Sequence, residues 1–201
     1  MKTKNYIPFK KIFQEHNGVL RVLDAIKLGV PEYIVYEMYQ RGELIKEGRG
    51  LYRLGDAQLL GNPDLVRVSM LIPKSVICLI SALYFYELTT QIPYSVYIAL
   101  PKNVGKPRID YPPIEVTWMV PSLYSVGIDE HVIDGVKIRI YGREKTIADC
   151  FKFRKRVGDD VALEALKEYI KQPQIDVHLL LEYAKINRVE KMVLPYLKSL
   201  I

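Results

Sequence analysis

The sequence predicts an α+β protein in which a small unit of short helices and one hairpin precedes a larger mixed α/β unit. Three observations support this fold class. Apolar residues recur at helical spacing in several segments, strand-like segments rich in Val, Ile and Tyr lie between prolines, and glycine turns separate alternating stretches. The chain has 201 residues, of which 49% are hydrophobic, so it can bury a sizeable core.

The first unit is predicted to span residues 1–56 and to begin with three short helices. The first helix, FKKIFQEH, ends at Asn17-Gly18, which is a typical C-terminal signal. The second lies within VLRVLDAIKLG and ends at Gly29. Pro31 opens the third, PEYIVYEMYQRG, because the N–H that proline lacks has no partner in a first helical turn.

The third helix separates into two faces at 100° per residue. One face is predicted to be core and carries Pro31, Ile34, Val35 and Met38. The other face is polar and aromatic and carries Tyr33, Tyr36, Glu37 and Gln40. Short helices joined by a glycine turn, with an exposed polar face on the last helix, are typical of a helix-turn-helix.

The stretch LIKEGRGLYRL predicts a two-stranded hairpin after the third helix. Apolar and basic residues alternate on both sides of Gly48-Arg49-Gly50, where positive φ angles are expected. A hairpin directly after a helix-turn-helix is a wing. Lys46, Arg49 and Arg53 place positive charge on this wing, and flexible basic tips contact DNA phosphates well.

The net charge of +6 favours a polyanionic partner, and we predict that the winged helix-turn-helix binds double-stranded DNA. The predicted contacts are Tyr33, Tyr36, Gln40, Lys46, Arg49 and Arg53. Arg49 suits either the phosphate backbone or a minor groove. The exposed face of the third helix carries Glu32 and Glu37 but neither Lys nor Arg. A winged helix that binds a protein is therefore the alternative.

Residues 57–201 are predicted to form a second domain with helices, a small antiparallel sheet and a C-terminal helical part. One helix opens at Asn62-Pro63, and a second, apolar on most faces, covers residues 74–88. Strands are predicted in YSVYIALP and PIEVTWMVP, and DEHVIDGVKIRIYG predicts a hairpin closed by Asp-Gly. The last helices are predicted in REKTIADCFKFRKRVG, DDVALEALKEYI, DVHLLLEYAKIN and VEKMVLPYLKSLI.

The second domain shows no catalytic motif: a P-loop, a Gly-x-Ser-x-Gly elbow and a His-Glu-x-x-His sequence are all absent. A Mg²⁺-dependent nuclease needs acids and a lysine on adjacent strand positions. Asp110, Glu115 and Lys137 are the candidate set, but the stretch EVT lacks the lysine expected two positions after the acid. We therefore predict no enzyme, no catalytic residue, no metal site and no cofactor, with a divergent nuclease as a remote alternative.

A run of positive charge near FKFRKRVGDD has two interpretations. Its members are Lys145, Lys152, Arg154, Lys155 and Arg156. Cations at a helix C-terminus are usually solvated and favourable to the helix dipole. They also suit contact with an acidic partner or a nucleic acid.

The two cysteines indicate a reducing, cytoplasmic location. Cys78 and Cys150 lie in apolar stretches without a Cys or His at metal-ligand spacing, so two buried free thiols are expected and a disulfide is the rarer alternative. The basic start MKTKNYIPFKK lacks the apolar region of a signal peptide. No run of 18 apolar residues occurs, so no membrane partner is expected.

The order of the motifs resembles the AbiEi family of bacterial antitoxins. The resemblance covers residues 18–170 and is carried by GVLRVLDAIKLGVPEYIVYEMYQRGELIKEGRGLYRL, then PKSVICLISALYFYELTTQIPYSVYIALP, then DGVKIRIYGREKTIADCFKFRKRVGDDVALEAL. The wing stretch alone would be a weak marker. The segments ICLISAL, LTTQIP, IALP and REKTIADC are more specific.

The resemblance implies an N-terminal winged helix-turn-helix and a C-terminal antitoxin domain in a type IV toxin–antitoxin system for abortive phage infection. It implies repression of the protein's own operon through inverted repeats in the promoter. It also implies action against a co-encoded nucleotidyltransferase-like toxin, without indicating direct contact, and no enzymatic activity. Thr89, Thr90 and Gln91 are expected to form a turn, and Thr146 and Asp149 to start and pack a helix.

Overall fold

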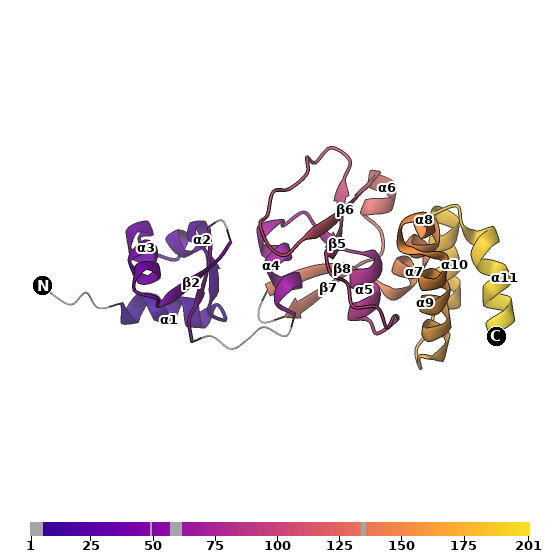
Figure 1. Ribbon diagram of the computed structural model, residues 1–201, viewed down its shortest axis with the longest axis horizontal. Helices are drawn as coiled ribbons and strands as arrows, with labels where there is room; N and C mark the ends of the chain where they lie inside the picture. The colour runs from indigo at the N-terminus through magenta and orange to yellow at the C-terminus, as the bar shows by residue number, and fades with distance from the viewer. Residues whose placement is uncertain (1–5, 49, 57–61, 134–135) are drawn as a thin grey trace, which may run out of the picture. The chain divides into compact units, whose positions relative to one another are not determined.

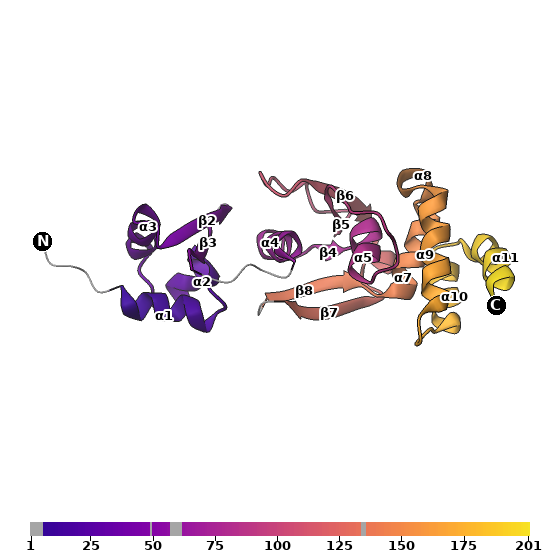
Figure 2. The ribbon, with the colours of Figure 1, turned by 60° about the horizontal axis from the view of Figure 1, so that its bottom comes forward.

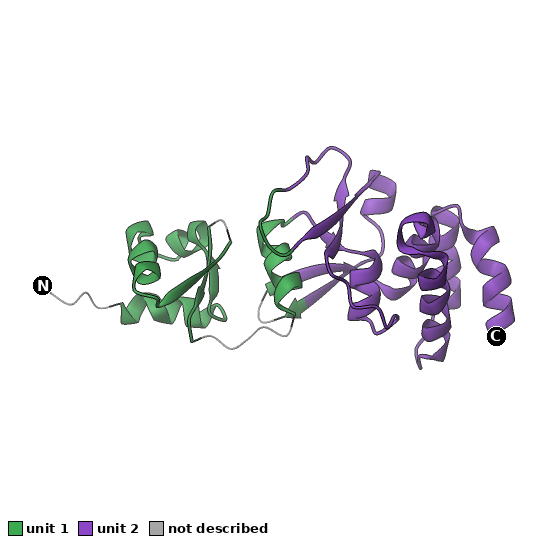
Figure 3. Cartoon of the chain, in the orientation of Figure 1, with its two compact units in different colours: residues 1–73, 108–112, 132–137 green, residues 74–107, 113–131, 138–201 purple. Residues whose placement is uncertain are grey.

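The computed structural model describes residues 6–48, 50–56, 62–133 and 136–201 (Figure 1). The chain forms two compact units (Figure 3). Unit 1 comprises residues 1–73, 108–112 and 132–137, and unit 2 comprises the remaining residues 74–107, 113–131 and 138–201. The domain boundary expected after residue 56 adjoins residues 57–61, which lie outside the described part of the chain.

Unit 1 begins with a winged helix-turn-helix. Its elements are α1 (Ile7–Glu15), β1 (Val19–Arg21), α2 (Val22–Lys27), α3 (Glu32–Gln40), β2 (Leu44–Gly48) and β3 (Leu51–Leu54), followed by α4 (Pro63–Leu71). The three strands form an antiparallel sheet in the order β1-β3-β2. The predicted α+β class and the helix-turn-helix with its hairpin are confirmed.

Strand β1 precedes the second helix and was not predicted. Residues 19–21 pair with β3 in the register Val19 to Arg53 and Arg21 to Leu51, so α2 starts only at Val22. Three residues are too few to show an alternating pattern, and their apolar spacing continues into the helix. The pairing of β1 with β3 could therefore not be predicted from the sequence pattern.

The core of the winged helix forms as the third-helix pattern predicts. Ile34, Val35 and Met38 of α3 are buried, at 3%, 0% and 0% exposed. They pack with Phe13 of α1, Ala25 of α2, Val30 of the turn and Leu44, Tyr52 and Leu54 of the sheet. Gly29 adopts a φ of +92° in the turn between α2 and α3, a conformation that favours glycine.

Unit 2 is built on a five-stranded sheet with helices. Its elements are β4 (Val76–Ile77), α5 (Leu79–Phe85), β5 (Val96–Pro101), β6 (Ile114–Met119), α6 (Pro121–Tyr124), β7 (Ile128–Ile133), β8 (Val136–Tyr141), α7 (Arg143–Lys152), α8 (Arg154–Val157), α9 (Asp159–Lys171), α10 (Val177–Ile186) and α11 (Glu190–Leu200). The strand order is β6-β5-β4-β8-β7, and the outer end of the β7–β8 hairpin, residues 132–137, is assigned to unit 1. The Asp134-Gly135 turn lies outside the described residues.

The sheet is mixed, which corrects the prediction of a small antiparallel sheet. Strand β5 pairs in parallel with β6, and β4 pairs in parallel with β8, whereas β4 and β5 are antiparallel. Parallel neighbours need a long return connection. Residues 102–113 supply it between β5 and β6, where the sequence shows only a basic loop.

The apolar segment at 74–88 is a strand and a shorter helix, not the single helix that was predicted. Val76 and Ile77 form β4 in the middle of the sheet, and α5 begins at Leu79. Short apolar runs do not distinguish a buried strand from a buried helix. The β-branched pair Val76-Ile77, three residues after Pro73, was the available strand signal.

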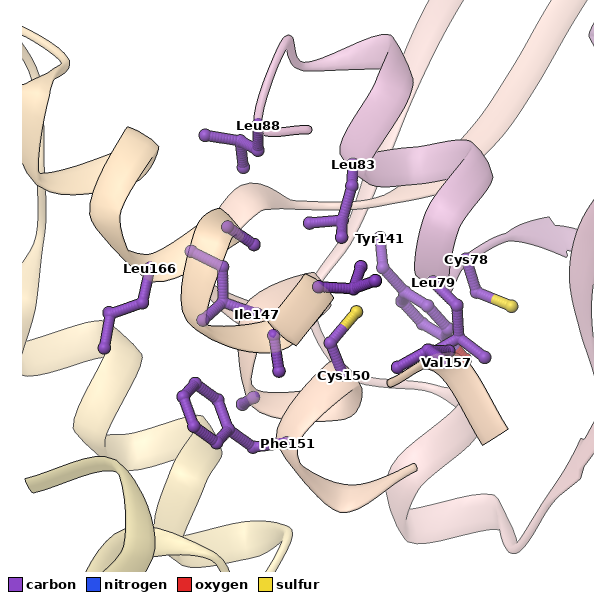
Figure 4. Packing of buried hydrophobic residues seen from close by; sticks show 14 of the residues in the cluster. Cys78, Leu79, Leu83, Leu88, Tyr141, Ile147, Cys150, Phe151, Val157 and Leu166 are labelled. Atoms are coloured by element: carbon purple, nitrogen blue, oxygen red, sulfur yellow. The ribbon is translucent and has the colours of Figure 1, made fainter. Parts of the chain in front are cut away.

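Helix α7 lies at the centre of the core of unit 2. Figure 4 shows its residues Ile147, Cys150 and Phe151 among side chains from α5 and α9. Helices α9, α10 and α11 group next to α7 in both views (Figures 1 and 2). Cys78 and Cys150 are buried and free, as predicted, and burial raises the pKa of both thiols.

A buried ion pair lies inside this apolar core. Lys145 and Asp149 are each 0% exposed, and the Lys145 ammonium donates to both carboxylate oxygens of Asp149 at 2.5 and 2.6 Å. Asn187, at the end of α10, donates its amide to Asp149 at 2.7 Å. The pair therefore links α7 to α10, and Lys145 does not belong to a solvated basic run.

The LTTQIP segment is a turn held by Glu164 of α9. Thr89 and Thr90 donate their hydroxyls to the Glu164 carboxylate at 3.0 and 2.9 Å, and the Thr90 N–H donates at 2.9 Å. The Gln91 N–H donates to the Thr89 hydroxyl at 3.2 Å, which closes the predicted turn. Burial alone would raise the pKa of Glu164, but the hydrogen bonds from Thr90 and Thr89 lower it.

The Glu164→Gln variant is expected to be less stable than the wild type by about 1 kcal/mol at pH 7, because a neutral amide accepts these hydrogen bonds more weakly. The lowered pKa makes the carboxylate's contribution present above its ordinary pKa of 4.5 and lost as the pH falls. Urea unfolding at pH 7 and pH 3 measures this difference. A difference that does not shrink at pH 3 contradicts the account, and Glu168→Gln on the same helix is the control.

Candidate nucleic-acid interface

Helix α3 presents the predicted polar and aromatic face. Tyr33 is 60% and Tyr36 48% exposed, and Gln40 is exposed at the end of the helix. The opposite side of the same helix is fixed in the core by Ile34 and Val35. The three predicted contacts therefore lie on one face of a firmly anchored helix.

A cluster of tyrosines joins this face to the sheet. Tyr52 of β3 is 2% exposed and meets the rings of Tyr36 and Tyr39 edge-on, with centroids 6.3 and 5.7 Å apart. Burial and the neighbouring Tyr36 and Tyr39 raise the pKa of Tyr52. Tyr39 is itself 39% exposed, and it was not among the predicted DNA contacts.

The hairpin of β2 and β3 is the predicted wing. Lys46 of β2 is exposed, pairs in register with Tyr52, and forms no ion pair within the described residues. The strand register shifts between Lys46 and Gly48, and Gly50 has a φ of +68°. Arg49 lies outside the described residues.

Arg53 lies in an ion cluster on the hairpin. Its side chain is only 15% exposed, and its Nε donates to Glu47 at 2.8 Å. Arg67 of α4 also pairs with Glu47. Two cations thus share one carboxylate, and the charge of Arg53 is balanced within unit 1. The alternation in the sequence predicts that Arg53 belongs to the wing but does not reveal this partner.

Other cations of the winged helix are also engaged. Arg41 lies over the ring of Tyr6, with its guanidinium carbon 4.7 Å from the ring centroid. Lys10 pairs with Asp56 at 2.7 Å, which raises the pKa of Lys10 and lowers that of Asp56 through the same hydrogen bond. The charge of Lys10 is therefore balanced by a carboxylate of the same unit.

The candidate nuclease residues do not form a nuclease arrangement. Glu115 of β6 pairs with Arg156 at 2.6 Å. Strands β5 and β4 separate β6 from β8, which carries Lys137, so the acid and the lysine are not on adjacent strands. The described residues contain no group of three His, Cys, Asp or Glu side chains placed to hold a metal ion.

The basic run near residues 152–156 has structural partners. Arg156 also donates to Thr117 at 2.8 Å and to the Val116 carbonyl at 3.1 Å, along the edge strand β6. Arg154 pairs with Asp159 at 3.4 Å, and Lys152 donates to the Asn187 carbonyl at 3.1 Å.

Within the described part of the chain, no helix is long and apolar enough to cross a membrane.

Comparison with known proteins gives one family. Residues 10–55 match the model of the family described as transcriptional regulator, AbiEi antitoxin. The match extends from α1 through α3 to the end of β3, which is the winged helix-turn-helix described above. A search of curated proteins found no match. The resemblance seen in the sequence is confirmed over this segment, which matches the AbiEi antitoxin family of transcriptional regulators.

Proposed function

We propose that this protein is a DNA-binding autorepressor and the antitoxin of a type IV toxin–antitoxin system. One observation carries the proposal. The segment that matches the AbiEi transcriptional regulators, residues 10–55, is a winged helix-turn-helix whose α3 exposes Tyr33, Tyr36 and Gln40. An exposed polar face on the third helix beside a wing is the arrangement with which such domains enter a major groove.

In this mechanism α3 lies in the major groove and the wing lies against the flanking backbone. The Gln40 amide can pair with adenine, the hydroxyls of Tyr33 and Tyr36 can bind phosphates or base edges, and Glu37 can accept from a cytosine amine. Lys46 and Arg49 neutralise phosphates from the wing. Two copies then occupy an inverted repeat in the promoter.

Glu47 limits the positive charge of the wing because it binds both Arg53 and Arg67. The Glu47→Ala variant is expected to bind DNA of any sequence several-fold more tightly and with a steeper salt dependence, because Arg53 can then reach a phosphate. Fluorescence anisotropy at several salt concentrations measures both effects.

The control is Glu168→Ala, which removes an acid from the pair that Glu168 forms with Lys171 on α9 and changes the net charge equally. Weaker binding of Glu47→Ala, or equal gains for both variants, contradicts the proposed contact by Arg53.

The antitoxin role is assigned to the second domain, residues 57–201. Its proposed target is the activity of a co-encoded nucleotidyltransferase-like toxin, and it acts without catalysis of its own. The description of the matched family as an antitoxin supports an antitoxin role for the protein, although the match itself lies in residues 10–55.

A protein-binding winged helix is the second candidate function. The exposed face of α3 carries Tyr33, Tyr36 and Tyr39 together with Glu32 and Glu37, but no lysine or arginine. Tyrosine is enriched in protein interfaces, whereas basic residues dominate contacts with DNA. In this candidate, α3 binds the partner protein and DNA binding is incidental.

Two assays in cells test the proposal. A reporter is placed under the DNA upstream of the protein's own gene, and growth is followed while the adjacent gene is expressed. Repression of the reporter together with rescue of growth supports both roles. Rescue without repression favours the protein-binding candidate. The absence of both repression and rescue overturns the proposal.

A further inference from the structure

A basic cleft of about 900 Å³ lies within unit 1, beside the wing. Its walls come from the end of β1, the start of α2, strand β2 with Gly50, the end of α4 and residues 108–111. All of these residues belong to the same compact unit (Figure 3). Gly48 permits the close packing of the wing on α4, because a Cβ at this position would lie 3.1 Å from Leu71.

Three cations line the cleft: Arg21, Lys46 and Arg108. Lys46 and Arg108 form no ion pair within the described residues, and Arg21 donates only to the backbone carbonyl of Met70. Of the two lining acids, Glu47 is already balanced by Arg53 and Arg67. Asp110 is the other. The cleft therefore has an excess of positive charge.

An aromatic ring adjoins these cations. Tyr111 lines the cleft and is 54% exposed, with the Arg67 guanidinium 5.2 Å from its ring centroid. An exposed tyrosine ring beside arginine and lysine side chains suits a nucleotide, because the base can stack on the ring while the cations bind the phosphate. The volume lies within the range of small-molecule sites.

We propose that this cleft binds the phosphate group of a nucleotide through Arg21, Lys46 and Arg108. The nucleotide belongs either to bound DNA or to a free mononucleotide, and both present the same phosphate chemistry. Because Lys46 is also a proposed wing contact, the DNA source rests on the proposed function. In that case, Arg108 adds a phosphate contact from outside the winged helix.

The test compares full-length Arg108→Ala with the wild type. The probes are a fluorescein-labelled duplex of arbitrary sequence and a fluorescent ATP analogue with a chelator to exclude metal ions. Lys102→Ala is the matched control, because Lys102 is an exposed cation of the same connection that does not line the cleft.

Arg108→Ala is expected to weaken binding of at least one probe about tenfold, as for the loss of one charge-assisted hydrogen bond, while Lys102→Ala does not. A loss confined to the duplex, with a salt slope lower by about one unit, identifies DNA as the source. A loss confined to the ATP analogue identifies a free nucleotide. If neither probe binds the wild type, or if both variants behave alike, the cleft is not a phosphate site. If the wild type binds the ATP analogue but not the duplex, the proposed function is contradicted. The effect of Arg108→Ala on the ATP analogue then tests whether the cleft binds phosphate.

Discussion

The Asp149→Ala variant is expected to lose about 3–5 kcal/mol of its free energy of unfolding. Lys145 is 0% exposed, and the only carboxylate that its ammonium contacts within the described residues is that of Asp149. Removal of this carboxylate leaves a positive charge buried in the apolar core around α7. It also leaves the Asn187 amide without its acceptor.

Chemical denaturation of Asp149→Ala at pH 7 measures the loss. The double variant Lys145→Met with Asp149→Leu isolates the effect of the buried charge, because it removes both charges and, like the single variant, leaves the Asn187 amide without its acceptor. Replacement of a buried ion pair by apolar side chains is often neutral or stabilising. If the free energy of unfolding of Asp149→Ala lies within about 1 kcal/mol of the wild-type value, Lys145 must find another partner or reach solvent.

The second large effect is expected on the exposed face of α3. Replacement of Tyr33, Tyr36 and Gln40 by alanine is expected to reduce the preference for promoter DNA over random DNA by at least about fivefold for each side chain that binds a base edge. Binding to random DNA is expected to persist, because the phosphate contacts proposed for Lys46 and Arg49 do not depend on sequence.

Competition binding with the promoter duplex and a shuffled duplex measures this preference. Because Tyr36 packs against Tyr52, the variant Tyr36→Phe keeps the ring and removes only the hydroxyl. It separates the effect of the hydroxyl on DNA binding from the effect of the ring on packing. An unchanged preference in the triple variant would exclude α3 as the reader of the sequence.

The winged helix was predictable because its signals are local. Asn17-Gly18 and Gly29 mark turns, and the burial of Ile34 and Val35 follows from the helical period alone. The exposed positions of Tyr33 and Tyr36 follow from the same period. Strand β1 was missed because its partner, β3, lies far along the chain.

The roles of the charged residues were not predictable, because they depend on tertiary partners. Arg53 is balanced by Glu47, six residues away across the hairpin, and Arg156 meets Glu115 from a distant strand. Lys145 looks like part of a basic run. Its spacing of four residues from Asp149 was a usable signal, since opposite charges at i and i+4 on a helix face each other.

The strand order of unit 2 could not be predicted from the sequence either. Both YSVYIALP and PIEVTWMVP are typical strands, and they are β5 and β6. Their parallel pairing depends on the path of residues 102–113, for which the composition shows only a basic loop. Composition does not specify the direction in which a long connection returns.

The most direct test of the central claim is the binding of the full-length protein to the DNA upstream of its own gene. The affinity is compared with that for random DNA at two salt concentrations, with Lys46→Ala and Arg49→Ala alongside. We expect tighter binding to the upstream DNA, and a salt slope that falls by about one unit for each wing variant. Equal affinity for both DNAs, with no change in either variant, would contradict the repressor account and favour a winged helix that binds a protein.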